Sequence, residues 1–439
     1  MKKIVQMMVM LVALVLAGQA HAAVRIDLTS ANTDPLPIAL PALMGDTEAE
    51  KKVGESITAL IESNLEGSGL FKSLAKDSFL QTEESLRVNG PDFQQWRQIK
   101  AEAMLTGTVT VDGKGDNATA RIEFRLYDIY AEKQIVGRRY TASVKFWRHI
   151  AHRISDDIYT SLTGEEGYFT TRIVYIGEQR VEARTAKKLC VMDQDGGNQQ
   201  CLTDGGHLVL TPRFSPTAQQ VVYMSYASGR PRLYLLDLPT GQQEILGDFP
   251  GLNSSPRFSP DGRKIAMTLT QDDDGNPDIY VMDINRRIPK RLTVHQGIDT
   301  SPSYSPDGKQ IVFNSNRGGK PALYIMDGDG NNVRRLTYGE GRYYAPAWSP
   351  RGDLIAFVKE IKGRFHIGVI DPDGNEERLL TDSFMDESPS WSPNGRVIIF
   401  SRQTGDSNYV YSIDLTGHNL RRVPTPTAAS DPSWSALLK

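Results

Sequence analysis

The chain has 439 residues, of which 39% are hydrophobic and 23% charged, and its formal net charge is -3 at pH 7. This length predicts two or more domains, because single domains usually hold about 100–200 residues. The nearly balanced charge gives no basic footprint for nucleic acid and no acidic tail, so no nucleic-acid partner is predicted.

The N-terminus has the pattern of a secretory signal peptide. Two lysines precede an apolar run over residues 4–16, and a small-x-small motif ends at Ala22. A membrane anchor is the alternative, but the run is shorter than the about 20 apolar residues that a spanning helix needs. We predict that residues 1–22 are removed by cleavage between Ala22 and Ala23 and that the mature protein has no direct membrane span.

Residues 23–165 predict a small mixed α/β domain. Short strands are expected at residues 24–28 and 37–40, and a helix at residues 48–65, where apolar residues recur at i, i+4 spacing. The further expected elements are a helix at residues 92–100, strands at 103–111, 121–130 and 134–144, and a helix from 146 to about 164.

A phrase of the form small-Pro-x-aromatic-Ser recurs six times in the rest of the chain. Its aromatic residues lie 44, 46, 44, 43 and 43 residues apart, and four-stranded propeller blades repeat about every 40–50 residues. Each phrase is followed by a tight turn and by three short strands. Recurrence in every unit indicates packing rather than catalysis. The six phrases are Thr211–Ser215, Ser255–Ser259, Ser301–Ser305, Ala345–Ser349, Ser388–Ser392 and Asp431–Ser435.

The first and last repeat units are incomplete in complementary ways. Residues 172–203 supply three strands with no phrase before them, and residues 431–438 supply a phrase with nothing after it. Joined, they make one blade, and a ring closed in this way leaves no open sheet edge. The sequence therefore predicts a multidomain protein with a six-bladed all-β propeller over residues 166–439, closed by strands from both ends.

Motifs for catalysis or metal binding are weak in this sequence. It has no nucleophile elbow, phosphate-binding loop or dinucleotide fingerprint. Two acidic loops, residues 272–283 and 327–338, begin like calcium loops but lack the Gly at position six and the Glu at position twelve. His149 and His152 lie on one predicted helix without a carboxylate or cysteine at metal-ligand spacing. No catalytic residue, cofactor or metal ligand is predicted.

The residues just before each phrase vary between units while the phrases stay nearly constant. Each innermost strand of a propeller starts at one face of the ring, so these residues should surround one mouth of the channel. Solvated loops also vary, but mixed aromatic and acidic side chains are typical of protein interfaces. The predicted partner-binding residues are Leu252, Asn253, Ser254, Ser255, Asp299, Thr300, Tyr343, Tyr344, Asp386, Glu387 and Asp431.

The two cysteines of the chain, Cys190 and Cys201, flank a predicted hairpin connection at residues 193–198. A four-residue loop would place them opposite each other, whereas another register would leave two free thiols. An even number of cysteines in an exported protein favours a disulfide. We therefore predict a cross-strand disulfide between them.

The repeat and the layout together resemble the TolB family. The pattern S-P-x-[FYW]-S-P-D-G, followed by L-Y-x-M-D and R-L-T, is similar to the family's propeller repeat, although propellers attached to serine peptidases carry similar ones. The order of signal peptide, α/β domain, junction phrase at Tyr168–Tyr175 and six blades extends the resemblance over the mature chain. The cysteine pair and the missing Asp-Gly turn after Ser215 depart from the family pattern.

The resemblance implies a non-enzymatic periplasmic interaction protein of the Tol-Pal system, supporting outer-membrane integrity and envelope constriction at cell division. It implies that the propeller binds the peptidoglycan-associated lipoprotein Pal and that the N-terminal region binds TolA, without a cofactor. The alternative from another class is a lactonase-like propeller hydrolase with a metal in the channel. Its candidate ligands are Asp299, Asp386, Glu387 and Asp431.

Overall fold

The computed structural model describes residues 25–26, 34–115, 118–182, 184–251, 253–270 and 275–437. The chain divides into two compact units, Met1–Glu165 and Glu166–Lys439. The predicted cleavage position between Ala22 and Ala23 lies outside the described residues, as does Leu252. Of the strand predicted at residues 24–28, only Arg25 and Ile26 are described, and they belong to no strand.

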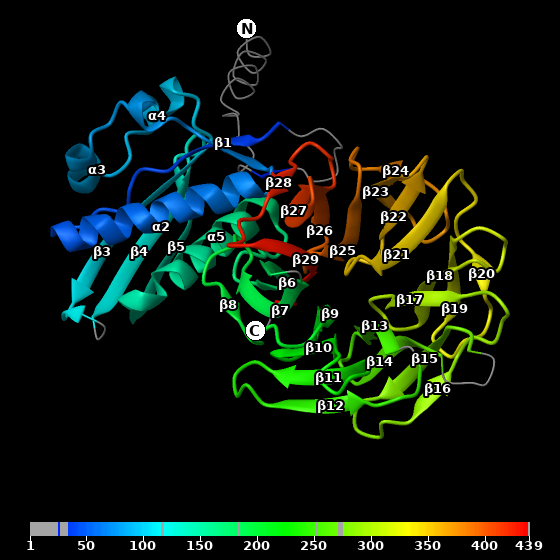
Figure 1. Ribbon diagram of the computed structural model, residues 1–439. Coiled ribbons are helices and arrows are strands. Elements are labelled where there is room, and N and C mark those ends of the chain that lie inside the picture. Colours follow the sequence, from blue (N-terminus) through cyan, green and yellow to red (C-terminus); the bar gives the residue numbers. More distant parts are fainter. Residues whose placement is uncertain are drawn as a thin grey trace, which may run out of the picture. The chain divides into compact units, whose positions relative to one another are not determined.

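The N-terminal unit contains a mixed five-stranded sheet of order β2-β1-β3-β4-β5. Strand β1 is parallel to both of its neighbours, and β3, β4 and β5 form an antiparallel meander. Helices α2 and α5 pack side by side along the sheet (Figure 1). The elements are β1 (Leu36–Ala39), α2 (Glu48–Gly67), β2 (Phe71–Ser73), the 3-10 turn η1 (Lys76–Ser78), α3 (Glu83–Asn89), α4 (Phe93–Gln98), β3 (Ala103–Asp112), β4 (Thr119–Asp128), β5 (Lys133–Ser143), the 3-10 turn η3 (Val144–Phe146) and α5 (Trp147–Thr163).

Helix α2 begins at a capping box. The Thr47 side chain accepts a hydrogen bond from Glu50 N, while Glu50 Oε2 accepts one from Thr47 N at 2.8 Å. Glu50 Oε1 also accepts a hydrogen bond from Val111 N at 2.8 Å, which ties the helix start to β3. These bonds, that from Thr47 N first, lower the pKa of Glu50 to about 2, because they favour the charged carboxylate.

The described residues of the second unit form six antiparallel sheets of four strands, arranged as a ring (Figure 1). The predicted fold class, a six-bladed propeller preceded by a mixed α/β domain, is confirmed. Blade 1 contains β9 (Val209–Phe214), β10 (Gln220–Ser225), β11 (Arg232–Asp237) and β12 (Gln243–Gly247). Blade 2 contains β13 (Asn253–Phe258), β14 (Lys264–Leu269), β15 (Asp278–Asp283) and β16 (Pro289–Arg291). Blade 3 contains β17 (Asp299–Tyr304), β18 (Gln310–Ser315), β19 (Ala322–Asp327) and β20 (Arg334–Arg335).

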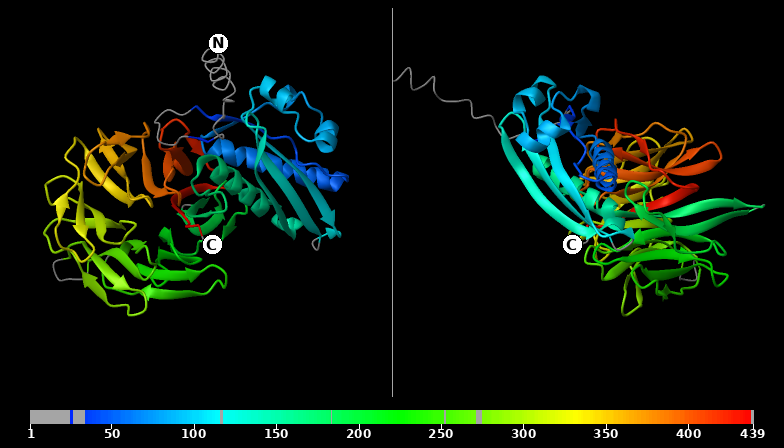
Figure 2. Two further views of the ribbon diagram at one scale, coloured as in Figure 1. Left: turned by 180° about the vertical axis from the view of Figure 1, so that it is seen from behind. Right: turned by 90° about the vertical axis from the view of Figure 1, so that its left-hand side faces the viewer.

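The remaining blades complete the ring, which Figure 2 shows from behind. Blade 4 contains β21 (Arg342–Trp348), β22 (Ile355–Ile361), β23 (Arg364–Ile370) and β24 (Arg378–Leu379). Blade 5 contains β25 (Asp386–Trp391), β26 (Val397–Thr404), β27 (Ser407–Asp414) and β28 (Arg421–Arg422). Blade 6 contains β29 (Ala428–Trp434), β6 (Arg172–Val181), β7 (Arg184–Asp193) and β8 (Gln200–Cys201).

Blade 6 joins the two ends of the second unit. Its innermost strand β29 pairs antiparallel with β6, so the red and green ends of the ring lie side by side (Figure 1). Beyond the strand, Ser435 N donates to Arg172 O at 2.8 Å and Arg172 N donates to Ser435 Oγ at 3.0 Å. Trp434 Nε1 donates to Thr171 Oγ1 at 2.7 Å. These bonds hold the chain end in the ring.

Serines at the third position of the phrase connect neighbouring innermost strands. Ser303 Oγ accepts a hydrogen bond from Trp348 N at 3.0 Å, and Ser390 Oγ accepts one from Trp434 N at 3.1 Å. Ser433 Oγ accepts a hydrogen bond from Phe214 N at 3.3 Å, across the closure of the ring. In blades 3, 5 and 6 the phrase therefore bonds directly to the next blade.

Candidate interaction site at the channel mouth

Every innermost strand has a β-bulge at the first residue of its phrase. The pairing register with the second strand shifts there in all six blades. The first residue of each phrase has a left-handed backbone conformation although it is never glycine. This conformation costs about 1–2 kcal/mol of conformational energy for each such residue. Because the bulge breaks the regular alternation of the strand, the side chains before it point in a different direction from the one that the phrase residues would predict. The φ values are 48° at Thr211, 52° at Ser255, 55° at Ser301, 45° at Ala345, 56° at Ser388 and 49° at Asp431.

Two of the acidic residues predicted at the mouth are buried in ion pairs. The Asp386 side chain is 0% exposed, and its two oxygens accept hydrogen bonds from Arg402 Nε and Nη2 at 2.7 and 2.8 Å. The Asp299 side chain is also 0% exposed, and its Oδ2 accepts a hydrogen bond from Arg317 Nη2 at 2.6 Å. Each carboxylate is therefore paired with an arginine inside the propeller and is not exposed at the surface of the mouth.

Aromatic rings complete the surroundings of these ion pairs. The Arg402 guanidinium lies 5.5 Å from the ring centre of Phe400 and 5.1 Å from that of Tyr411. The Arg317 guanidinium lies over two rings of blade 3 in the same way, 5.2 Å from each. Cation–π contacts of this kind favour a desolvated guanidinium. The two aspartates therefore belong to buried polar clusters at the start of blades 3 and 5 instead of forming a surface.

Tyr343, at the start of β21, is likewise buried, so its ring is not part of the exposed surface of the mouth. Its hydroxyl donates to Glu377 Oε2 at 2.8 Å, and its ring packs against Phe357 with 5.4 Å between ring centres. Lys359 Nζ lies 4.7 Å from the centre of the Tyr343 ring and is ion-paired with Glu377. A side chain engaged on all these sides is part of the blade core.

The open part of the mouth contains Glu387 and Asp431. Partial loss of water around the carboxyl, and the charge of Asp431, raise the pKa of Glu387. Asp431 Oδ1 accepts a hydrogen bond from Ser388 Oγ at 2.7 Å, and its Oδ2 accepts one from Thr211 N at 3.4 Å. This carboxylate therefore bridges blades 5, 6 and 1 across the mouth.

The other predicted mouth residues have mixed exposure. Tyr344 is half-buried, with its ring centre 6.4 Å from that of Phe365. Thr300 is half-buried and its Oγ1 lies 3.3 Å from Asn314 Oδ1. The remaining positions are Ser254 and Ser255, both half-buried, and Asn253, which belongs to β13.

Three exposed apolar side chains lie at the mouth, and the sequence-based choice of mouth residues missed two of them, Phe384 and Leu208. Phe384, Ile298 and Leu208 are 61%, 45% and 40% exposed. Each lies one or two residues before an innermost strand, β25, β17 and β9 respectively. The sequence pattern that could have predicted these side chains is an apolar residue at nearly the same distance before the phrase in three repeat units. These side chains give the mouth an apolar component.

The predicted cysteine pair lies at the outer edge of blade 6. Cys190 and Cys201 are directly opposite each other in β7 and β8, and their sulfur atoms are bonded. The turn between the strands is stabilised by Asp193 and Asp195: Asn198 Nδ2 donates to Asp193 Oδ2 at 2.7 Å and Gly197 N to Asp195 Oδ1 at 3.0 Å.

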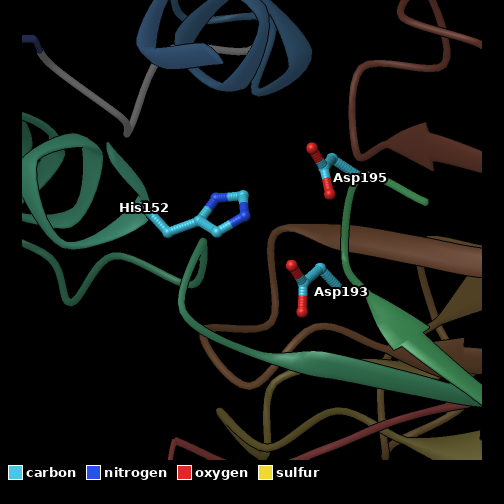
Figure 3. Close-up of side chains that lie close together, drawn as sticks. All are labelled: His152, Asp193 and Asp195. Atoms are coloured by element: carbon cyan, nitrogen blue, oxygen red, sulfur yellow. The ribbon is translucent and has the colours of Figure 1, made fainter. Parts of the chain in front are cut away.

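Figure 3 draws these two aspartates together with His152, which belongs to α5 of the N-terminal unit. Within that unit, His152 Nδ1 lies 3.0 Å from Asn64 Nδ2, a donor on α2. This contact connects α5 to α2 inside the N-terminal unit. Each of the three side chains has a structural role inside its own unit.

The fold defines a class of protein: a closed six-bladed propeller that follows a small α/β domain in the chain. The family model described as "TolB beta propeller domain" matches residues 159–438, and that described as "TolB amino-terminal domain" matches residues 24–135. The chain belongs to the TolB family.

Relatives with curated names agree with this assignment. The chain is 46% identical over 224 residues to the "Tol-Pal system protein TolB" of Paramagnetospirillum magneticum, covering 51% of this chain and 49% of the relative. It is 50% identical over 227 residues to the protein of the same name from Pelagibacter ubique, covering 49% and 50%. The chain thus spans about half the length of these curated relatives in the matches. The crystal structure of TolB from Acinetobacter baumannii matches with a TM-score of 0.82 and 28% identity, covering 94% of this chain and 99% of that chain.

Proposed function

We propose that this chain is a non-enzymatic periplasmic component of the Tol-Pal system that binds Pal through the channel mouth and TolA through its N-terminal region. In this role it supports outer-membrane integrity and envelope constriction at cell division. The observation that carries the proposal is the mouth itself, where exposed apolar side chains surround an acidic centre. The names of its relatives supply the envelope system.

The composition of the mouth fits a protein partner. Phe384 and Ile298 are exposed apolar groups of the kind that anchor interfaces, and Tyr344 is a half-buried aromatic beside them. Glu387 and Asp431 supply negative charge at the channel, which favours a partner with basic groups and raises its association rate. The mouth thus combines affinity from apolar contact with selectivity from charge.

The hydrolase alternative loses two of its four candidate ligands. Asp299 and Asp386 are held by Arg317 and Arg402, so a metal would have to displace two buried ion pairs. Among the described residues, none of the helices is both long and apolar enough to cross a bilayer.

Calorimetric titration of the full chain with purified Pal tests the proposal. Phe384→Ser and Tyr344→Ala should each weaken binding about tenfold or more, because loss of a central apolar anchor costs more than about 1 kcal/mol. Ile288→Ser is the matched control, since Ile288 is 74% exposed but lies between β15 and β16, away from the innermost strands. Equal affinity for all four proteins would reject the mouth as the Pal site.

The TolA arm of the proposal is tested separately. Removal of residues 23–33 should weaken TolA binding and leave the affinity for Pal unchanged. Loss of both affinities, or of neither, would contradict the division of partners between the two units.

A further inference from the structure

The innermost strands end, opposite the mouth, around a cavity of ≈ 340 Å³. Its lining comes from all six blades, because the third to sixth positions of each phrase contribute. The third position is Arg213 in blade 1 and Arg257 in blade 2, but Ser303, Ala347, Ser390 and Ser433 in the others. Two long cationic side chains thus share this level of the channel with four small ones. The small side chains do not fill the channel, and the unfilled space is the cavity.

Arg213 is buried without full hydrogen bonding. It is 9% exposed, its Nη1 donates to Pro212 O at 2.6 Å, and its Nε has no partner among the described residues. Burial lowers the pKa of Arg213 to about 10 and the nearby Asp431 partly offsets this, so the guanidinium is charged at neutral pH. A buried, charged group with an N–H that has no hydrogen-bond acceptor destabilises the fold, unless a ligand supplies the acceptor.

Arg257 adds a second guanidinium at the same level of the channel. It occupies the equivalent position of the adjacent innermost strand and is half-buried, with Nη1 3.5 Å from Pro256 O. An anion between these two strands could pair with both guanidinium groups.

Serine hydroxyls provide further donors to the cavity. Ser303, Ser390 and Ser433 each accept a backbone N–H, as described above. A hydroxyl that accepts such a bond still has a proton to donate. Among the described residues no acceptor is assigned to these three protons, so they are available to an oxyanion.

We propose that this cavity binds a small organic carboxylate, with Arg213 and Arg257 on its charged end and the serine hydroxyls beside them. The planar guanidinium fork matches a carboxylate in geometry. The rest of the wall is mixed: Trp348, Trp391 and Trp434 line it together with proline rings, and further serines lie between them. The ligand is therefore a carboxylate on a compact apolar body. Asp431, which lies near Arg213, is shared with the mouth, but the carboxylate site does not depend on the Pal proposal.

Cyclohexanecarboxylate is a suitable probe because it has such a body and does not absorb where tryptophan does. Titration of the full chain, followed by tryptophan fluorescence and calorimetry, should show saturable binding. The uncharged cyclohexanecarboxamide and inorganic phosphate should bind at least about tenfold more weakly, because each lacks either the charge or the apolar body.

Arg213→Met and Arg257→Met should each weaken carboxylate binding about tenfold or more. The matched control is Arg334→Met, because Arg334 is exposed on the outer strand β20. If circular dichroism shows that Arg213→Met fails to fold, Arg257→Met alone tests carboxylate binding. Arg257 is only half-buried, so its replacement should disturb folding less. Unsaturable binding, equal binding of the amide, tighter binding of phosphate, or unchanged affinity in Arg257→Met would each overturn the proposal.

Discussion

At the scale of single residues, Asp382 and Asp386 show how burial determines the contribution of an ion pair to stability. The Asp382 side chain is 85% exposed and pairs with Arg364 at 3.0 Å, whereas Asp386 is fully buried and bidentate with Arg402. Water screens the first pair but not the second.

Removing either carboxylate should therefore have very different effects on stability. We expect Asp386→Ala to lower the free energy of unfolding by about 3–5 kcal/mol, because it leaves Arg402 buried and unpaired. Asp382→Ala should lower it by about 0–1 kcal/mol. Urea denaturation of both variants measures the difference, and losses of equal size would show that the buried pair has no special role.

Glu50 gives the N-terminal unit a defined pH dependence. Its pKa in the folded state, about 2, is below the ordinary value of 4.5. The stabilisation is therefore present above pH 4.5 and is lost as the pH falls through the folded pKa. Glu50→Gln should destabilise α2 at neutral pH, and its difference from the parent should vanish near pH 2.

Hydrogen exchange of the α2 amides at several pH values checks this expectation. Glu55→Gln is the control, since Glu55 is exposed on the same helix. A Glu50→Gln difference that stays constant as the solution is acidified would contradict the assigned role of the carboxylate.

At the scale of elements, the hairpin of β7 and β8 depends on a short cross-link. Cys190 and Cys201 are 11 residues apart, so the loop that they close is small. Thiol titration of the unreduced, denatured protein should find no free thiol. Replacing both cysteines by serine should cost at most about 3 kcal/mol. Two titratable thiols would show that the strands pair without the bridge.

Strand β29 has a larger structural role, because it closes the ring. Ending the chain after Ser430 removes the phrase that pairs with β6 and exposes a sheet edge. The propeller should then melt at a much lower temperature, while the N-terminal unit changes less. Ending the chain after Ala436 is the control, since it keeps Ser435 and its bonds to Arg172. Equal melting temperatures of the two truncated proteins would disprove closure by β29.

Element boundaries were predictable where the sequence is periodic. Helix α2 and the strands β3, β4 and β5 lie within about two residues of the predicted ranges. Strand β2 and helix α3 were missed, because elements of 3 and 7 residues are too short to show a period.

The burial of Asp299 and Asp386 could not be read from their own positions. Side chains alternate between faces along a strand, and each bulge shifts the alternation. The signal was a second residue, an arginine: Arg402 lies opposite Asp386 in β26, and Arg317 lies in the turn that follows β18. Pairing those two positions would have predicted the ion pairs.

At the scale of the whole molecule, six copies of one phrase form a ring whose two channel ends differ. The mouth carries Glu387, Asp431 and exposed apolar groups, while the opposite cavity carries Arg213 and Arg257. The ring is nearly regular in backbone but not in these side chains. This difference between the two ends is the basis of the two proposals, a protein partner at the mouth and a carboxylate in the cavity.

Hydrogen exchange of the full chain with and without purified Pal tests the central claim most directly. We predict slower exchange in the loops that lead into the innermost strands, at residues 203–208, 294–298 and 382–385. We predict no change around Pro350 and Pro393, at the other end of the channel. Protection confined to the cavity end, to the outer strands or to the N-terminal unit would contradict a Pal site at the mouth.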